Sequence, residues 1–213
     1  MLDTIREDVF HLLLELPRNH LVSWTSGNIS ARDVESGLIV IKPSGVPYDE
    51  LSPEKLVIVN MNGEVVEGQL KPSSDLSSHI YIYNKKPEIN GIVHTHSPYA
   101  SAFAASGKSL PVFITEAAEE FGGPVPCTDF TLIGDDSMGK QVIKYMGKCP
   151  AVLLKQHGVI TTGSCARKAV ELAVLLENCA RITLYSILLG EPQEIDAKSI
   201  SELYYRQNYI YGQ

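Results

Sequence analysis

Two histidines separated by a single residue, and a third farther along the chain, could together bind a metal ion. His94 and His96 lie in the stretch VHTHS, and on extended backbone the side chains at i and i+2 point to the same face. His157 comes shortly after the apolar run AVLL and precedes a glycine, so it stands where a buried strand ends. Three neutral imidazoles and one carboxylate suit Zn²⁺ and leave room for a substrate. We therefore predict one divalent metal ion, with zinc preferred and Mn²⁺ or Co²⁺ compatible with the same ligands.

The other histidines have weaker patterns. A single histidine near an apolar strand is more often a packed or surface residue than a ligand. His11 and His20 have no potential ligands beside them, and we interpret them as surface residues. His79 follows Asp75 by one turn of a predicted helix, so it either supports a metal ligand or is simply packed, and packing is favoured.

Three short stretches rich in serine and glycine could bind a phosphate group. They are SGNIS at 26–30, KPSG at 42–45 and PSSD at 72–75. Small residues let a phosphate approach the backbone N–H groups, and a helix N-terminus adds a favourable dipole. Lys42 supplies one full positive charge. Each stretch alone is more commonly a plain turn, and none is a Walker A loop, so the prediction depends on their occurring together.

Apolar periodicity predicts the elements that position these residues. We expect helices near 3–16, 75–84, 98–105, 136–146, 165–189 and 200–209, the first stopping at Pro17 and the longest capped by Ser164. We expect strands at 37–42, 90–94 and 151–154, and a hairpin at 57–66 that turns at Asn62-Gly63. Helices that alternate with strands, together with a hairpin, indicate an α/β sandwich with a mixed sheet. With no linker in the chain, we predict one domain over residues 1–213.

Composition limits the partners and the compartment. The net charge of -7 comes from scattered acids, which disfavours nucleic acid but allows a local site for a phosphorylated small molecule. No uninterrupted apolar run reaches the roughly 18 residues that span a bilayer, and the N-terminal residues lack the basic start of a signal peptide. We expect a cytoplasmic protein without a membrane partner. Its four cysteines form no CxxC pair, so we interpret them as packing residues: Cys127, Cys149, Cys165 and Cys179.

The ordered set SGNIS, KPSG, PSSD, HTHS and QHG resembles the class II aldolase/adducin family from about Thr25 to the C-terminus. The resemblance implies an α/β/α sandwich around a central mixed, mostly antiparallel sheet. It also implies a homotetramer with active sites between subunits. Enzymes of the family make or break a carbon–carbon bond beside a metal-bound carbonyl.

Within the family the chain looks closest to the enzymes that epimerise L-ribulose 5-phosphate at C4. Asp75 stands where fuculose-phosphate aldolases usually carry Glu, and the tail YIYGQ is similar to that of the epimerases. The match implies four metal ligands: Asp75, His94, His96 and His157. It implies a phosphate site made of Gly27, Asn28, Ser44, Gly45, Ser73 and Ser74, assisted by Lys42. Tyr211 would act as an acid/base in a neighbouring subunit.

Two departures leave the substrate open. Glu119 stands where the epimerases carry an acid/base Asp, and either Glu119 or Glu120 could take that role or form a solvated helix face. The stretch after 126–128 is also shorter than in the epimerases. The expected reaction cleaves C3–C4, rotates the bound glycolaldehyde phosphate and re-forms the bond. The alternatives are an aldolase that releases its fragments, acting on L-fuculose 1-phosphate or a related deoxysugar phosphate, and an adducin-like interaction module without catalysis.

Overall fold

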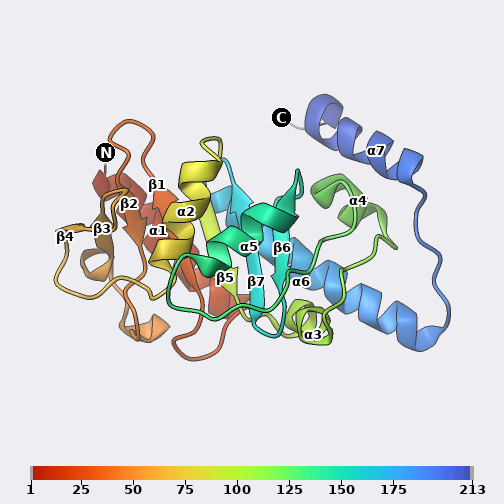
Figure 1. Cartoon of the computed structure of the whole chain (residues 1–213), viewed down its shortest axis with the longest axis horizontal. Coiled ribbons are helices and arrows are strands. Elements are labelled where there is room, and N and C mark those ends of the chain that lie inside the picture. The colour runs from red at the N-terminus through yellow and green to blue at the C-terminus, as the bar shows by residue number, and fades with distance from the viewer. Residues whose placement is uncertain (1, 212–213) are drawn as a thin grey trace.

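A seven-stranded sheet with the order β4-β3-β2-β1-β5-β7-β6 separates two layers of helices (Figure 1). The structure is a computed structural model that describes residues 2–211. The strands are β1 (Asn28–Arg32), β2 (Ile39–Ile41), β3 (Val57–Val59), β4 (Val65–Glu67), β5 (Gly91–Thr95), β6 (Ala151–Leu154) and β7 (Gly158–Gly163). All neighbouring strands pair antiparallel, and one isolated parallel bridge joins Cys127 to Leu153. The predicted α/β/α sandwich is confirmed, and its seven strands form an antiparallel sheet.

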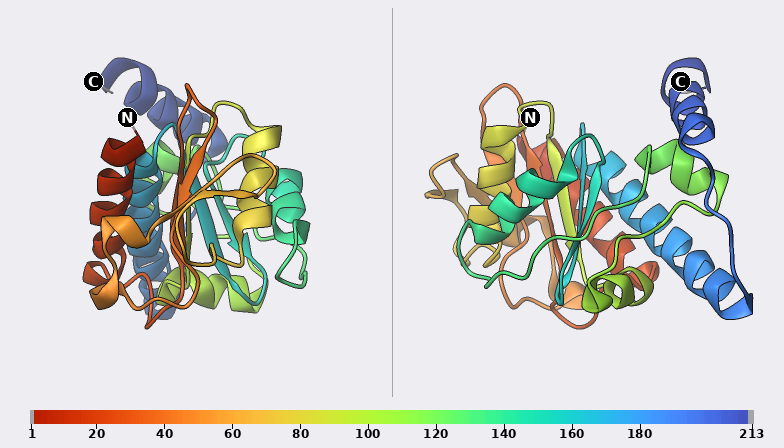
Figure 2. Two further views of the ribbon diagram at one scale, coloured as in Figure 1. Left: turned by 90° about the vertical axis from the view of Figure 1, so that its left-hand side faces the viewer. Right: turned by 45° about the vertical axis from the view of Figure 1, so that its right-hand side comes forward.

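Helices cover both faces of the sheet. They are α1 (Leu2–Arg18), α2 (Leu76–Lys85), α3 (Pro98–Ser106), α4 (Thr115–Phe121), α5 (Ser137–Met146), α6 (Ala166–Leu189) and α7 (Ala197–Arg206). Short 3₁₀ turns span Tyr48–Glu50 and Pro53–Lys55, and a π-helical turn spans Gln207–Tyr211. Figure 2 shows α1 and α6 on one side of the sheet and α2 and α5 on the other. The N-terminus of α2 therefore lies on the face of the sheet that α5 also covers.

The inner strand β5, between β1 and β7, is buried on both faces, which explains its apolar sequence. Val93 packs with residues of α1 and α6, whereas Ile92 packs with residues of α2 and α5. Side chains alternate along a strand, so His94 follows Ile92 onto the face covered by α2. The pattern of apolar residues therefore decides which layer receives His94.

The structure departs from the predicted elements at several places. β1 and β7, and the short helix α4, were not predicted, because Gly, Ser and Thr dilute the apolar pattern of the strands. α1 continues through Pro17 to Arg18, since a proline in the last turn disturbs only the few bonds behind it. The N-cap of α6 is Cys165 rather than Ser164, and the Cys165 side chain makes no capping hydrogen bond. The other predicted helices and strands are present with shifts of one to three residues at their ends.

α6 is long and apolar enough to cross a membrane by length and composition alone. One 18-residue window of this helix has a mean hydropathy of 1.5, although charged residues interrupt the run. The core helix of a soluble protein passes the same test. Nine residues of α6 are buried, and the helix contacts the sheet and neighbouring helices, so packing accounts for part of its apolar character. Ile187, Leu188 and Leu189 at its C-terminal end are exposed.

Close packing at the start of β5 predicts a steric requirement for Gly91. A Cβ atom at this position would clash with the backbone of Cys165 and Ala166, at the start of α6. Gly91→Ala should therefore lower the free energy of unfolding by about 1–3 kcal/mol, because the backbone must shift to accept the methyl group. Urea denaturation measures the loss. Gly123→Ala is the matched control, since a Cβ there meets nothing within 4 Å. Equal stability of the two variants would contradict this account.

Candidate metal centre

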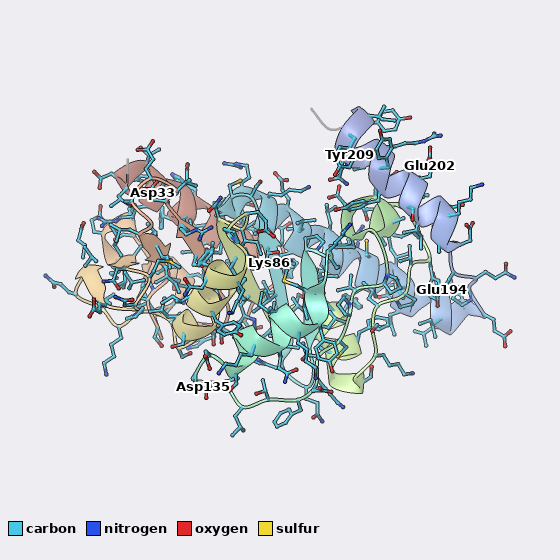
Figure 3. The ribbon with its side chains drawn as sticks, turned by 45° about the horizontal axis from the view of Figure 1, so that its top comes forward. Asp33, Lys86, Asp135, Glu194, Glu202 and Tyr209 are labelled. Carbon is cyan, nitrogen blue, oxygen red and sulfur yellow. The ribbon has the colours of Figure 1, made fainter. Side chains whose placement is uncertain are left out.

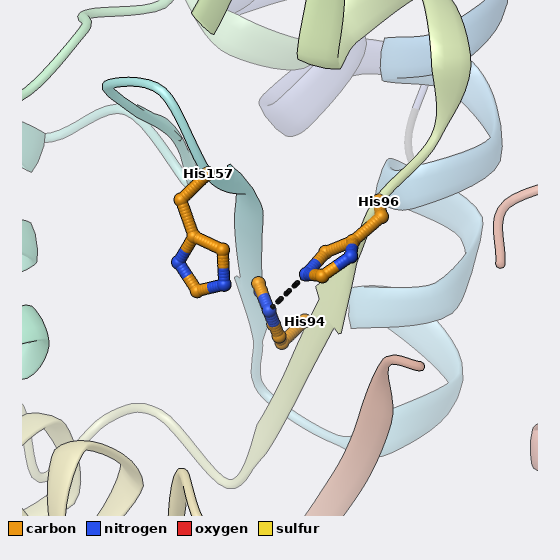
Figure 4. A group of neighbouring side chains, drawn as sticks. All are labelled: His94, His96 and His157. Carbon is orange, nitrogen blue, oxygen red and sulfur yellow. Dashed lines mark hydrogen bonds between the residues drawn. The ribbon is translucent and has the colours of Figure 1, made fainter. Parts of the chain in front are cut away.

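Three imidazoles converge at one end of the sheet (Figure 4). His94 lies near the end of β5, and His96 directly follows that strand. His157 lies in the turn between β6 and β7. One nitrogen from each ring lies within 4.8 Å of the others. The antiparallel pairing of β5 with β7 sets Thr95 opposite Val159, which brings the turn residue His157 beside the end of β5.

The tautomer of His94 leaves a lone pair directed into this cluster. Its Nδ1 lies 2.9 Å from the carbonyl oxygen of Val159, so Nδ1 carries the proton and donates it. Its Nε2 lies 3.0 Å from Nε2 of His96. In a neutral ring the lone pair of His94 therefore sits on Nε2, toward the other imidazoles. A buried histidine whose outer nitrogen is anchored by a backbone carbonyl has the arrangement common among zinc ligands. The donor set fits a divalent metal ion.

Glycine at position 158 lets the turn approach β5 closely. A Cβ atom there would lie 2.5 Å from the carbonyl oxygen of Thr95 and 2.8 Å from Cδ2 of His96. Gln156, before His157, adopts a left-handed backbone conformation with φ of 59°. The sequence QHG thus describes a turn whose conformation and spacing place the third ring.

Asp75 lies next to the three rings and approaches His94 most closely. Its Oδ2 is 4.0 Å from Nε2 of His94, and it accepts a hydrogen bond of 2.7 Å from Nδ2 of Asn28. Asp75 is buried at the N-cap of α2. Burial alone would raise the pKa of its carboxyl, but His94, His79 and Asn28 hold that pKa below its ordinary value. The position suits a carboxylate that faces a cation.

Burial favours the neutral form of the clustered histidines, most strongly for His94. It lowers the pKa of His94 to about 3, despite the opposite effect of the Asp75 carboxylate. Burial also lowers the pKa values of His96 and His157. Neutral imidazole is the form that binds metal ions, so the protein environment favours the state required for ligation.

The three serine- and glycine-containing stretches lie side by side next to the rings. Ser73 N donates to Lys42 O at 3.0 Å, and Ser44 N donates to Lys71 O at 2.9 Å, which pairs the second stretch with the third. Nδ2 of Asn28 lies 3.0 Å from Oγ of Ser73 and connects the first stretch. These bonds bring together Asn28, Ser44 and Ser73 of the predicted phosphate residues. Gly27, Gly45 and Ser74 are their neighbours along the chain.

The first of these stretches is only partly a loop. Ile29 and Ser30 belong to the central strand β1, and Ser30 Oγ bonds to Nδ1 of His79 and to the hydroxyl of Tyr83, each at 2.8 Å. His79 is fully buried, as the packing interpretation expected. Asn28 Oδ1 is buried without a hydrogen-bond partner among the described residues, and it lies on the side chain that holds Asp75.

Lys42 is directed at backbone rather than at open space. Its Nζ donates to the carbonyl oxygens of Thr25 at 3.2 Å and Val46 at 3.1 Å, and it lies 5.0 Å from the ring centre of Tyr48. Burial lowers the pKa of this ammonium to about 8. Lys42 therefore joins the loop before β1 to the loop after β2, and its ammonium group is bonded to both.

The candidate acid/base residues lie on other elements. Glu119 is on α4, and its carbonyl accepts a hydrogen bond from Asn208 of the C-terminal turn that also carries Tyr211. Figure 1 shows α4 and α7 beyond β6, away from α3, and Figure 3 shows Tyr209 and Glu202 at this outer end. Within residues 2–211, neither Glu119 nor Tyr211 hydrogen-bonds to the three histidines. Gly212 and Gln213 of the predicted tail motif lie outside the described residues.

Glu120 differs from its neighbour. Its two carboxylate oxygens accept hydrogen bonds from Lys168 at 2.9 Å and Gln207 at 3.2 Å, so it joins α4 to α6 and to the C-terminal turn. This engagement gives Glu120 a structural role and leaves Glu119 as the freer carboxylate of the pair.

One acidic residue near the centre was not singled out by sequence reasoning. Glu177 of α6 bonds to the first turn of α3, directly after His96. The only sequence signal was a single acid inside the apolar stretch AVLLENCA.

Comparison with known proteins gives consistent relatives. Residues 7–184 match the family described as class II aldolase and adducin N-terminal domain. The chain is 40% identical over 189 residues to L-ribulose-5-phosphate 4-epimerase UlaF of Salmonella paratyphi B, covering 84% of this chain and 83% of that protein. The family match spans Asp75, His94, His96 and His157 and ends before Tyr211.

Solved structures resemble the whole fold. An L-fuculose 1-phosphate aldolase superposes with a TM-score of 0.92 at 27% identity, over 97% of each chain. YgbL of Klebsiella pneumoniae, described as a putative aldolase/epimerase/decarboxylase, has a TM-score of 0.84 at 27% identity, over 94% of this chain and 97% of that one.

Removal of one imidazole tests the centre directly. His96→Ala should lose the bound divalent ion, because two imidazoles and one carboxylate hold an ion far more weakly than a complete ligand set. Metal content after dialysis, measured by inductively coupled plasma mass spectrometry, checks this. His11→Ala removes an exposed histidine of α1 and should keep the metal content of the parent. Equal metal content in both variants would contradict the assignment.

The buried histidines also predict how stability depends on pH. In the metal-free protein the folded-state pKa values of His79 and His94 are lowered from 6.5 to about 4 and about 3. The unfolded chain therefore binds more protons below pH 6.5, and the free energy of unfolding should fall as the pH drops from about 6.5 toward 4. Each such proton contributes a slope of about 1.4 kcal/mol per pH unit.

Urea denaturation in the presence of a chelator, at pH 7 and pH 5, measures this slope. His79→Gln should reduce the slope, while His11→Gln, at an exposed position, should keep it. A stability that rises as the pH falls would contradict the prediction.

Proposed function

The chain belongs to the class II aldolase and adducin family, and we propose that it is a metal-dependent L-ribulose-5-phosphate 4-epimerase. The observation that carries the proposal is the cluster of His94, His96 and His157 beside the three paired serine- and glycine-containing loops. A metal site next to a phosphate site suits a phosphorylated ketose. The 40% identity to an epimerase over most of both chains supports the same reaction.

We propose that Asp75 completes the ligand set with the three histidines. Its carboxylate faces Nε2 of His94, and Asn28 fixes its orientation. A divalent ion bound there, zinc by ligand preference, would act as a Lewis acid on a ketose oxygen.

The paired loops would hold the phosphate group of the substrate. Ser44 and Ser74 are exposed and offer hydroxyl donors, and Ser74 also lies just before α2, where backbone N–H groups and the helix dipole favour an anion. Gly27 and Gly45 have positive φ values and let the loops turn without side chains in the way. Lys42, whose ammonium group bonds to the loop backbone, would attract the phosphate by its charge rather than by direct contact. A fragment held by its phosphate can rotate and react on its other face.

Proton transfer to and from the C4 hydroxyl would involve Glu119 and Tyr211. Each general acid or base typically contributes about 10²–10⁴-fold in rate. Because both residues lie on the outer elements of the chain, we propose that they act across subunit contacts, with Tyr211 serving a neighbouring site. This arrangement requires an oligomer, which we propose to be a homotetramer. We further propose a cytoplasmic location and a single domain over the whole chain.

An aldolase that releases its two fragments is the second candidate. The high structural similarity to an L-fuculose 1-phosphate aldolase favours it, as does the short connection between Thr128 and α5. Such an enzyme would use the same metal and phosphate residues. The two candidates differ in whether the aldehyde fragment leaves the site before the bond re-forms.

A substrate panel separates the candidates. The metal-loaded protein should convert L-ribulose 5-phosphate to D-xylulose 5-phosphate without free aldehyde, because the phosphorylated fragment stays bound. Coupled assays for xylulose 5-phosphate, dihydroxyacetone phosphate and free aldehyde measure the outcome. Steady release of aldehyde and dihydroxyacetone phosphate from L-fuculose 1-phosphate, with no epimer formed, would replace the epimerase with the aldolase. Failure to bind metal and to convert either substrate would favour an adducin-like module.

A further inference from the structure

The carboxylate of Glu177 binds the start of a different helix. Its Oε1 accepts a hydrogen bond from Tyr99 N, and its Oε2 accepts one from Ala100 N, both at 2.9 Å. The side chain projects from the middle of α6, and it is half-buried where α6 packs against α3. Burial raises the pKa of this carboxyl, while the two amides act in the opposite direction. A charged group is held here by two directed bonds.

The first turn of α3 has no local cap. Its N-cap residue Ser97 makes no capping bond to the helix, and Pro98 at the first helical position has no N–H group. The next two backbone N–H groups are those of Tyr99 and Ala100, which the Glu177 carboxylate satisfies together. A negative charge at a helix N-terminus is also favoured by the helix dipole. Glu177 of α6 thus caps the N-terminus of α3 in place of a neighbouring residue in the chain.

α3 connects the two segments that carry His96 and His157. The helix begins two residues after His96, with the fully buried Ser97 between them. Near its other end, the carbonyl oxygen of Ala104 accepts a 3.0 Å hydrogen bond from Gln156 N, next to His157. Gln156 is the residue with the left-handed backbone, so this bond lies where the turn is least favourable for an ordinary side chain. A displacement of α3 would move both rings.

We propose that Glu177 is a positioning residue of the metal centre, which holds α3 and thereby the backbone that carries His96 and His157. The inference rests on the metal site of the proposed function but not on the choice of sugar. Glu177 touches no ring and would act only through α3. Outer residues of this kind typically change metal affinity by about 10–100-fold when they are replaced.

Titration with Co²⁺ tests the proposal, because the visible absorption of bound Co²⁺ reports both affinity and ligand geometry. Glu177→Gln keeps the shape of the side chain but turns an amide NH₂ toward one of the two N–H donors. We expect its Co²⁺ affinity to fall by about 10–100-fold, with an altered absorption spectrum and the helical circular dichroism of the parent.

Glu171→Gln is the matched control, since Glu171 is an exposed acid on the same helix, 4.0 Å from Lys168. It should bind Co²⁺ as the parent does. If Glu177→Gln does not fold, Glu177→Asp, which keeps the charge on a shorter arm, is titrated in its place with the same expectation.

A Glu177 variant that melts at a lower temperature but binds Co²⁺ with the affinity and spectrum of the parent would overturn the proposal, because the residue would then be only a helix cap. A parent protein that binds Co²⁺ but converts no sugar phosphate would defeat the proposed function, while the titration would still decide the role of Glu177. A parent that binds no Co²⁺ would overturn both.

Discussion

The pairing of β5 with β7 is the interaction on which the candidate centre depends. It sets Thr95 opposite Val159 and lets the carbonyl of Val159 accept the Nδ1 proton of His94. One register therefore fixes the position of the turn that carries His157 and the tautomer of a ring on the facing strand. A shift of one residue would send the side chains of β5 to the opposite faces of the sheet, since strand side chains alternate. The burial of Ile92 and Val93 in separate cores opposes that shift.

The same arrangement concentrates polar groups that lose hydration on burial. Neutral imidazoles tolerate burial better than charged ones, and the lowered histidine pKa values express this preference. Within residues 2–211, the Asp75 carboxylate lies beside them, and its pKa is held below the ordinary value by the surrounding histidines and the Asn28 amide. A neutral set of nitrogens beside a single anion is an environment that a divalent cation would complete.

Sequence predicted the clustering of the three histidines well because its signal is local. The alternation in VHTHS and the glycine after His157 depend on a few neighbouring residues, and the structure brings the three rings together. β1 could not be separated from a loop, since its small polar residues are buried by contacts from α2 that no local pattern reveals. Glu177 was missed for the same reason: its partners lie 77 and 78 positions away in the chain. Lys42 was predicted to assist a phosphate by its charge, but the carbonyls that surround it became apparent only in the fold.

Gly158 shows how such a centre constrains the variation of its sequence. Any side chain at this position would press on the Thr95 carbonyl and the His96 ring, so relief would require the opposite strand to move as well. The exposed serines of the neighbouring loops, Ser44 and Ser74, face no comparable obstacle. Over evolutionary time, the exposed loop positions can therefore change by single replacements, whereas the spacing between the two strands is inherited as a unit.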